Sequence, residues 1–177
     1  MDKEERNYCC LALLLLRVGN PCLRRYFKNQ WNAAGKYTPW TDCAQNGADL
    51  LRMFKPLWYE KKAVTSGDTS GWDMSLLINA LLHSRPPFVV AANLVAALKT
   101  LKEMRNNLCH SPVSRVEATE FQTSWRDGCN SLRLFGATAG DFDKVEQGES
   151  YIKSDRSHPS CMSFNTIYIH VVIQSFL

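Results

Sequence analysis

Residues Val89 to His110 read VVAANLVAALKTLKEMRNNLCH, and the expected architecture is built around them. Apolar residues recur three and four positions apart along this stretch, as they do on the buried face of a helix: Leu94, Ala97, Leu98, Leu101, Met104 and Leu108. Ser111-Pro112 follows directly, and a proline disfavours helix at the residue before it. We therefore predict a long central helix whose last two turns hold Arg105, Asn106 and His110.

A further helix is predicted on the C-terminal side of the central one. Ser114 and Glu117 match a capping box, in which the serine side chain accepts the N3 amide and the glutamate reaches back to the cap. The helix that they open would bury residues that again recur at spacings of three and four: Val116, Phe121, Trp125, Cys129, Leu132 and Phe135. Because the connection is short, this helix is expected to lie antiparallel to the central helix.

Two helices are predicted at the N-terminus, from about Lys3 to Val18 and from Asn20 to Trp31. Gly19-Asn20-Pro21 is the expected break between them, because asparagine is a good N-cap and proline suits the first helical position.

Two more helices are predicted before the central one. The first begins near Asp42 or Asn46 and carries Leu50, Leu51 and Phe54, with Trp58 as a candidate for the same face. Lys61 to Gly71 is polar and punctuated by glycine, which is typical of a connection. The second spans Met74 to His83 and has Asp73 as its expected N-cap. The fold class is therefore all-α, an antiparallel bundle of about five to six helices over residues 1–136.

Residues 137–177 are expected to form a linker and an irregular tail. Gly140 to Ser160 is rich in Gly, Ser and charged residues and poor in large apolar ones, which is typical of a linker. Met162 to Leu177 is apolar and β-branched, so it could form a strand, but the chain offers no obvious partner for one. This unpaired apolar end suggests a fragment or an alternatively ended product of a longer protein.

Composition favours a globular intracellular protein. Hydrophobic residues make up 45% of the 177, which is enough for a real core, and the net charge of +4 is too mild to identify a partner. The seven cysteines include no C-x-x-C pair, so neither a zinc site nor a disulfide framework is expected, and a cytoplasmic location fits. We predict no metal and no cofactor. The apolar run Leu11 to Leu16 is far shorter than the roughly 20 residues of a spanning helix, so no membrane association is expected.

Arg105, Asn106 and His110 are the candidate catalytic residues. Asn106 and His110 are four positions apart and share a helix face. A histidine can exchange a proton near neutral pH, and an arginine can hold a phosphate in a fork, which together would suffice to cleave RNA without a metal. The competing interpretation is structural, since the same groups can cap the carbonyls at a helix end. Cys109 precedes His110 directly and points to another face, which argues against a Cys-His dyad.

The sequence resembles the HEPN domain (higher eukaryotes and prokaryotes nucleotide-binding), in the subtype found at the N-terminus of the DAZ-interacting zinc-finger ubiquitin ligase. The resemblance runs from about Leu11 to Phe135. It rests on these segments: Cys22 to Phe27, Trp72 to Leu77, Leu81-Leu82, Arg105-Asn106 with His110, and Phe121, Trp125 and Leu132. It implies a helical bundle that commonly dimerises, so that two R-x(4–6)-H motifs meet across a cleft, with Arg105 and His110 as the active pair and Asn106 as their support.

Three functions follow as hypotheses. The first is an RNA-binding or dimerisation module, without enzymatic activity, inside a larger intracellular signalling or ubiquitin-ligase-related protein, with a second copy, single-stranded RNA or other signalling proteins as partners. The second is a metal-independent endoribonuclease that uses Arg105, Asn106 and His110 across a homodimer. The third is a purely structural bundle. The Cys and His spacing of a RING finger and a phosphate-binding G-x-x-x-x-G-K-[ST] loop are both missing from the 177 residues.

Overall fold

The computed structural model describes residues 2–154, and every regular element in that range is helical. The elements are α1 (Lys3–Leu13), the π-helical segment η1 (Leu14–Gly19), α2 (Asn20–Ala34), α3 (Ala44–Leu51), α4 (Lys61–Ser66), the 3-10 turn η2 (Thr69–Gly71), α5 (Met74–His83), α6 (Ala92–His110), α7 (Ala118–Arg133) and α8 (Ala139–Ser154). The predicted all-α class and helical bundle are confirmed.

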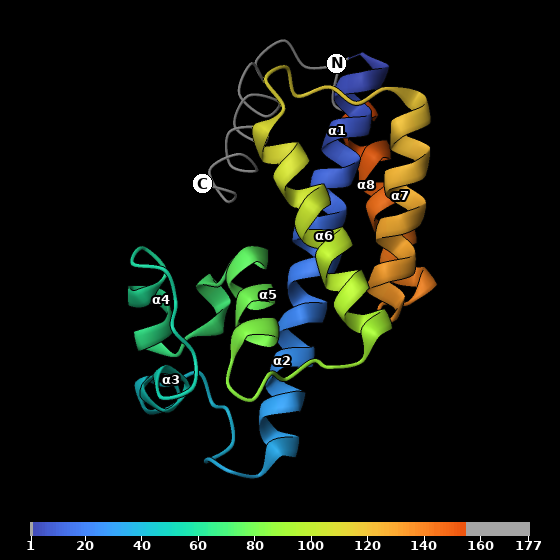
Figure 1. The fold of residues 1–177 in the computed structure, drawn as a ribbon. Helices are drawn as coiled ribbons and strands as arrows, with labels where there is room; N and C mark the ends of the chain where they lie inside the picture. The colour runs from blue at the N-terminus through green and yellow to red at the C-terminus, as the bar shows by residue number, and fades with distance from the viewer. Residues whose placement is uncertain (1, 155–177) are drawn as a thin grey trace.

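A continuous helical rod made of α1, η1 and α2 runs through the middle of the molecule (Figure 1). It starts at Asp2, whose side chain accepts the amides of Glu4 and Glu5 in a capping box. The predicted break at Gly19-Asn20-Pro21 is wrong, because Asn20 has helical φ and ψ of −57° and −49°. The Asn20 amide donates to the Leu15 carbonyl in a wide π-type turn, and the helix continues from this turn through Pro21, which has no amide N–H to donate.

Four helices pack around this rod. α6 and α7 lie side by side and antiparallel, as predicted, while α5 packs on α2 and α8 on the first half of the rod (Figure 1). Leucines and one phenylalanine from all the inner faces are completely buried, and each contributes about 2 kcal/mol by leaving water: Leu14, Leu15, Leu23, Phe27, Leu77, Leu81, Leu98, Leu101 and Leu132. Gly19 has a packing role, since a Cβ atom there would lie 2.3 Å from Cε of Met74 on α5.

The connection between α6 and α7 differs from its prediction. α7 begins at Ala118 with Glu117 as its N-cap residue, and no side chain caps it, so the predicted Ser114–Glu117 capping box is wrong. The Val116 amide donates to the Glu4 carbonyl at 3.1 Å, and the Arg115 guanidinium pairs with Asp2 and Glu4. These contacts hold the segment in a non-helical form against the start of α1, which competes with early helix formation.

Part of the stretch predicted as a linker forms the helix α8. Residues 139–154 are helical, and Phe142 and Val145, three apart on one face, are 5% and 2% exposed. The core therefore extends beyond residue 136. The few large apolar side chains of this polar segment give too weak a periodicity to identify a helix, whereas packing against α1 and η1 buries Phe142 and Val145. The strand predicted for Met162 to Leu177 lies outside the described residues.

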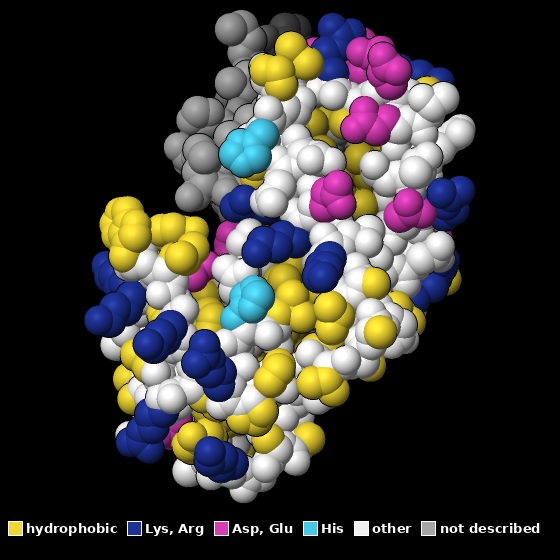
Figure 2. Space-filling model, viewed as in Figure 1, with side chains coloured by type: hydrophobic (Ala, Val, Ile, Leu, Met, Phe, Trp, Pro, Cys, Tyr) yellow, Lys and Arg dark blue, Asp and Glu magenta, His cyan; other side chains and the backbone are white. Residues whose placement is uncertain are grey.

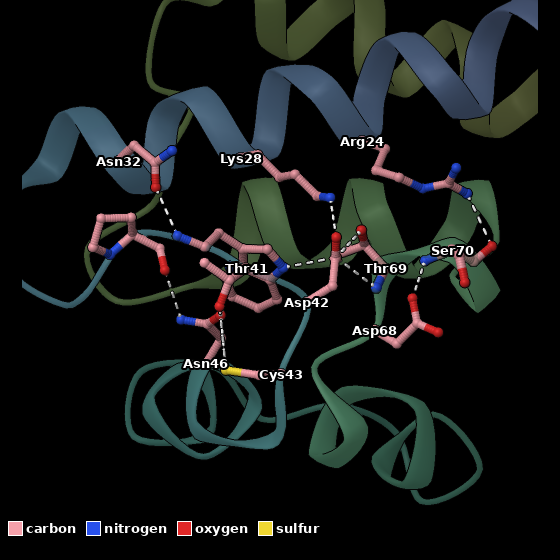
Figure 3. A network of polar contacts seen from close by, with 12 residues as sticks. Arg24, Lys28, Asn32, Thr41, Asp42, Cys43, Asn46, Asp68, Thr69 and Ser70 are labelled. Carbon is pink, nitrogen blue, oxygen red and sulfur yellow. Dashed lines mark hydrogen bonds and ion pairs between the residues drawn. The ribbon is translucent and has the colours of Figure 1, made fainter.

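A small subdomain of α3 and α4 is attached to one face of α2. Arg24, Lys28 and Asn32, spaced by four on α2, reach toward it (Figure 3). The Arg24 guanidinium donates to the Ser70 carbonyl at 3.1 Å, Lys28 pairs with Asp42, and the Asn32 carbonyl oxygen accepts the Trp40 amide at 2.8 Å. The stretch predicted as a connection, Lys61 to Gly71, holds α4 and η2 instead.

Candidate functional site at the end of helix α6

Arg105 lies in the second-last turn of α6, where its side chain is 16% exposed. Its Nη2 atom lies 3.3 Å from Oδ2 of Asp73. The other oxygen of Asp73 accepts the Leu76 amide at 2.8 Å, which confirms Asp73 as the N-cap of α5. Arg105 therefore joins the end of α6 to the start of α5, and its charge is partly compensated. The role of Asp73 as an ion partner was not predicted, because only the folded chain brings residues 73 and 105 together.

The three predicted residues are only partly brought together. Asn106 is half-buried, and its carbonyl oxygen accepts a hydrogen bond from Nη1 of Arg105 at 3.4 Å. His110 is exposed in the last turn of α6. Within residues 2–154 no hydrogen bond joins the His110 ring to Arg105 or Asn106. The arrangement thus holds a positioned guanidinium beside an amide, with an accessible imidazole one turn away.

A chain of hydrogen bonds extends this site away from Arg105. Nζ of Lys102 donates to the Asn79 carbonyl oxygen on α5 at 2.9 Å, and the Asn79 amide donates to Oε1 of Glu60 at 3.2 Å. The Glu60 side chain is buried, and its Oε2 accepts the Leu57 amide at 2.9 Å. Through this relay α6 is coupled to the loop that precedes α4.

The outward side of α6 carries a basic stripe, defined here as Lys99, Lys102 and Arg105. Residues three apart on a helix share a face, and two of these three residues bond to α5, so the stripe borders the α5–α6 seam. Lys99 and Glu103 stand four apart, but in the described chain no ion pair joins them. Figure 2 shows Lys and Arg side chains gathered on this face together with both histidines of the described range.

Neither cavity near these elements has the properties of an enclosed active site. The one beside the end of α6, lined in part by Asn107, Ser111 and Arg115, has a volume of about 50 Å³, whereas pockets for small ligands hold roughly 300–1,000 Å³. A larger groove of about 390 Å³ lies at the end of α2, where Trp31, Tyr37 and Phe88 line it. The residues that line this groove include no carboxylate and no histidine; Lys36 and Tyr37 are its titratable groups.

Cys109 is the thiol next to His110 at the end of α6. Burial raises the pKa of this thiol, despite the opposing charge of Arg105. The Cys43 thiol is exposed at the N-terminus of α3, far along the chain, and a hydrogen bond from the Thr41 hydroxyl lowers its pKa.

Among the side chains that the structure describes, no group of three or more His, Cys, Asp and Glu is arranged to hold a metal ion. No helix in this part of the chain combines the length and the apolar character that crossing a membrane requires.

Comparison of the chain with models of protein families, with curated proteins and with solved structures found no match. The resemblance to HEPN domains therefore stays a prediction.

Proposed function

We propose that this chain is a HEPN-like module that binds single-stranded RNA without cutting it. On the resemblance described above, it would act within a larger intracellular signalling or ubiquitin-ligase-related protein. The basic stripe of α6 is the observation that supports binding. Three cations at successive turns, two of them oriented by side chains of α5, can meet successive phosphates of one strand.

The ion pair of Arg105 supports binding over cleavage. A guanidinium that steadies the charge of a phosphorane works best when its positive charge is uncompensated. The Asp73 carboxylate at 3.3 Å offsets that charge in the protomer, and the His110 ring is not held beside Arg105. An arginine in this state still donates hydrogen bonds to a phosphate, because the guanidinium has five donors.

The test removes the two lysines of the stripe and leaves the Arg105–Asp73 pair intact. Binding of a short fluorescent single-stranded RNA is measured by anisotropy between about 50 and 200 mM salt for the wild type and for Lys99→Ala/Lys102→Ala. We expect the variant to bind about tenfold more weakly, and the slope of log K against log salt to fall in magnitude by about 1.4, because each phosphate contact to a single strand contributes about 0.7.

The matched control is Lys144→Ala, an exposed lysine on α8, a helix that packs against α1 and η1. It should retain the affinity and the salt slope of the wild type. A wild-type protein that fails to bind single-stranded RNA at low salt, or a double variant indistinguishable from Lys144→Ala, would rule out the proposal.

The alternative function is a metal-independent endoribonuclease. Its supporting observation is the exposure of His110, which leaves the imidazole accessible to a second copy of the chain. Two copies could then combine one His110 with the Arg105 of the other. Because this function depends on assembly, its test is given at the scale of the whole molecule in the Discussion.

A further inference from the structure

The loop between α3 and α4 exposes two aromatic rings. The Trp58 side chain is 87% exposed and that of Tyr59 is 61% exposed, whereas Trp31, Trp40 and Trp72 are at most 6% exposed. Trp58 was a candidate for the apolar face of a helix, but α3 ends at Leu51 and leaves it outside the core. Adjacent exposed apolar side chains with polar residues around them are typical of an interaction site.

The loop segment that carries the two rings is held in place by buried contacts and hydrogen bonds. Phe54, at the start of the loop, is buried, and the Lys61 amide donates to the Leu57 carbonyl at 3.1 Å. The buried Glu60 carboxylate accepts hydrogen bonds from the Leu57 amide and from the Asn79 side-chain amide. The ring planes of Trp58 and Tyr59 meet edge to face at 89°, with centroids 5.7 Å apart, so the two rings do not stack on each other.

The surroundings of the rings are cationic. Lys55, Lys61 and Lys62 are exposed within four residues of them. Glu60 is the one carboxylate between residues 50 and 67, and its side chain points inward and is 6% exposed. In Figure 1 the loop lies at the edge of the face that carries α6, and Figure 2 shows exposed hydrophobic side chains there, beside Lys and Arg.

We propose that Trp58 and Tyr59 are a stacking platform for the bases of single-stranded RNA, with Lys55, Lys61 and Lys62 contacting its phosphates. This inference rests on the proposed function and adds the residues that select a single strand. Aromatic rings stack on the faces of unpaired bases, which a duplex hides inside its own stack. The Lys102–Asn79–Glu60 relay connects the loop to the basic stripe of α6, so one strand could contact both.

A lipid surface is the less fitting partner for the same residues. Insertion into a bilayer needs apolar groups that point together in one direction, with cations around them at the depth of the headgroups. Here the two rings are perpendicular. Further Lys and Arg side chains lie on the face that carries α6, and cations spread over two elements suit a linear polyanion better than a membrane plane.

The experiment compares Trp58→Ala/Tyr59→Ala with Trp58→Phe/Tyr59→Phe in the same anisotropy assay, using a single-stranded RNA and a duplex of equal length. The alanine variant should lose roughly tenfold or more in affinity for the single strand, and its salt slope should match that of the wild type, because no phosphate contact is removed. The phenylalanine variant should retain most of the affinity, and affinity for the duplex should change little.

Val90→Ala is the control, since this side chain is apolar and 78% exposed on another loop. Thermal unfolding should show all three variants as stable as the wild type. If Trp58→Ala/Tyr59→Ala binds RNA normally while Lys99→Ala/Lys102→Ala does not, the stacking platform is rejected and the proposed function stands. If the wild type binds no RNA, the proposed function itself fails. Binding of vesicles that contain phosphatidylserine, lost in the alanine variant without any loss of RNA affinity, would also reject the platform.

Discussion

Asp42 accepts hydrogen bonds from three segments of the chain, as Figure 3 shows. Lys28 reaches it from α2, the Trp40 indole donates at 3.1 Å, and the amide and hydroxyl of Thr69 donate at 3.1 and 2.6 Å. Its φ of +56° lies in the left-handed region, which aspartate and asparagine tolerate better than most residues. Burial opposes ionisation, but the hydrogen bonds from Lys28 and Thr69 outweigh it and lower the pKa of Asp42 to about 2.

This carboxylate should give the protein a pH-dependent stability that Asp42→Asn removes, because asparagine keeps the backbone conformation and loses the charge. The folded-state pKa lies below the ordinary 3.8, so the stabilisation is complete above about pH 4 and is lost as the pH falls toward 2. After allowance for a side chain that is one-third exposed, we expect the wild type to exceed the variant by about 1 kcal/mol at pH 6, and by much less at pH 2.5.

Urea unfolding followed by circular dichroism at several pH values checks this expectation. Asp143→Asn, which removes an exposed carboxylate on α8, is the control and should differ little from the wild type at pH 6. A stability difference between the wild type and Asp42→Asn that stays constant down to pH 2.5 would contradict the assignment.

At the scale of elements, α3 and α4 pack so closely that backbone meets backbone. A Cβ atom on Gly47, inside α3, would lie 2.2 Å from the Val64 carbonyl oxygen and 2.7 Å from that of Thr65. Gly67, which ends α4 with a φ of +70°, approaches the Cys43 carbonyl in the same way. The two short helices therefore form one packed unit, because the glycine that each contributes has no Cβ atom to keep the backbones apart.

Gly47→Ala tests this packing, because the expected change in the free energy of unfolding has the opposite sign from that in an exposed helix. In an exposed helix the substitution would stabilise by about 1 kcal/mol, since alanine is the better helix former. Here we expect a loss of about 1–3 kcal/mol, because backbone atoms must move to admit the methyl group. Thermal unfolding measures the difference. Gly140→Ala on α8, where a Cβ atom would meet nothing closer than 3.9 Å, should be neutral or stabilising, and a stabilised Gly47→Ala would refute the close packing.

At the scale of the whole molecule, cleavage of RNA would require a second copy of the chain. Within the protomer, Arg105 is paired with Asp73 and the exposed His110 ring is not held next to it. We expect the protein to leave single-stranded RNA intact in EDTA, even at concentrations where sedimentation detects dimers. Cleavage that survives EDTA, grows with the dimer fraction and vanishes in both Arg105→Ala and His110→Ala would establish the endoribonuclease in place of the binding module.

The sequence by itself determined the all-α class and the positions of the helices with a strong local pattern. α5 follows its Asp73 cap to His83 as predicted, and α6 ends at His110, before the predicted stop at Ser111-Pro112. The capping preference of aspartate and the three-four repeat of leucines act over a few residues, so they can be read without knowing the fold. The placement of Arg105, Asn106 and His110 at one helix end followed from the same local signals.

Only the tertiary structure decided the rest, because it depends on contacts between residues far apart in the sequence. The Val116–Glu4 hydrogen bond keeps residue 116 out of α7, which begins at Ala118. Packing against α1 and η1 buries Phe142 on α8, and the helix continues from the π-type turn through Pro21. The same holds for the candidate site. Its Asp73 partner, its link to Glu60 and the exposure of Trp58 all depend on packing that local periodicity does not encode.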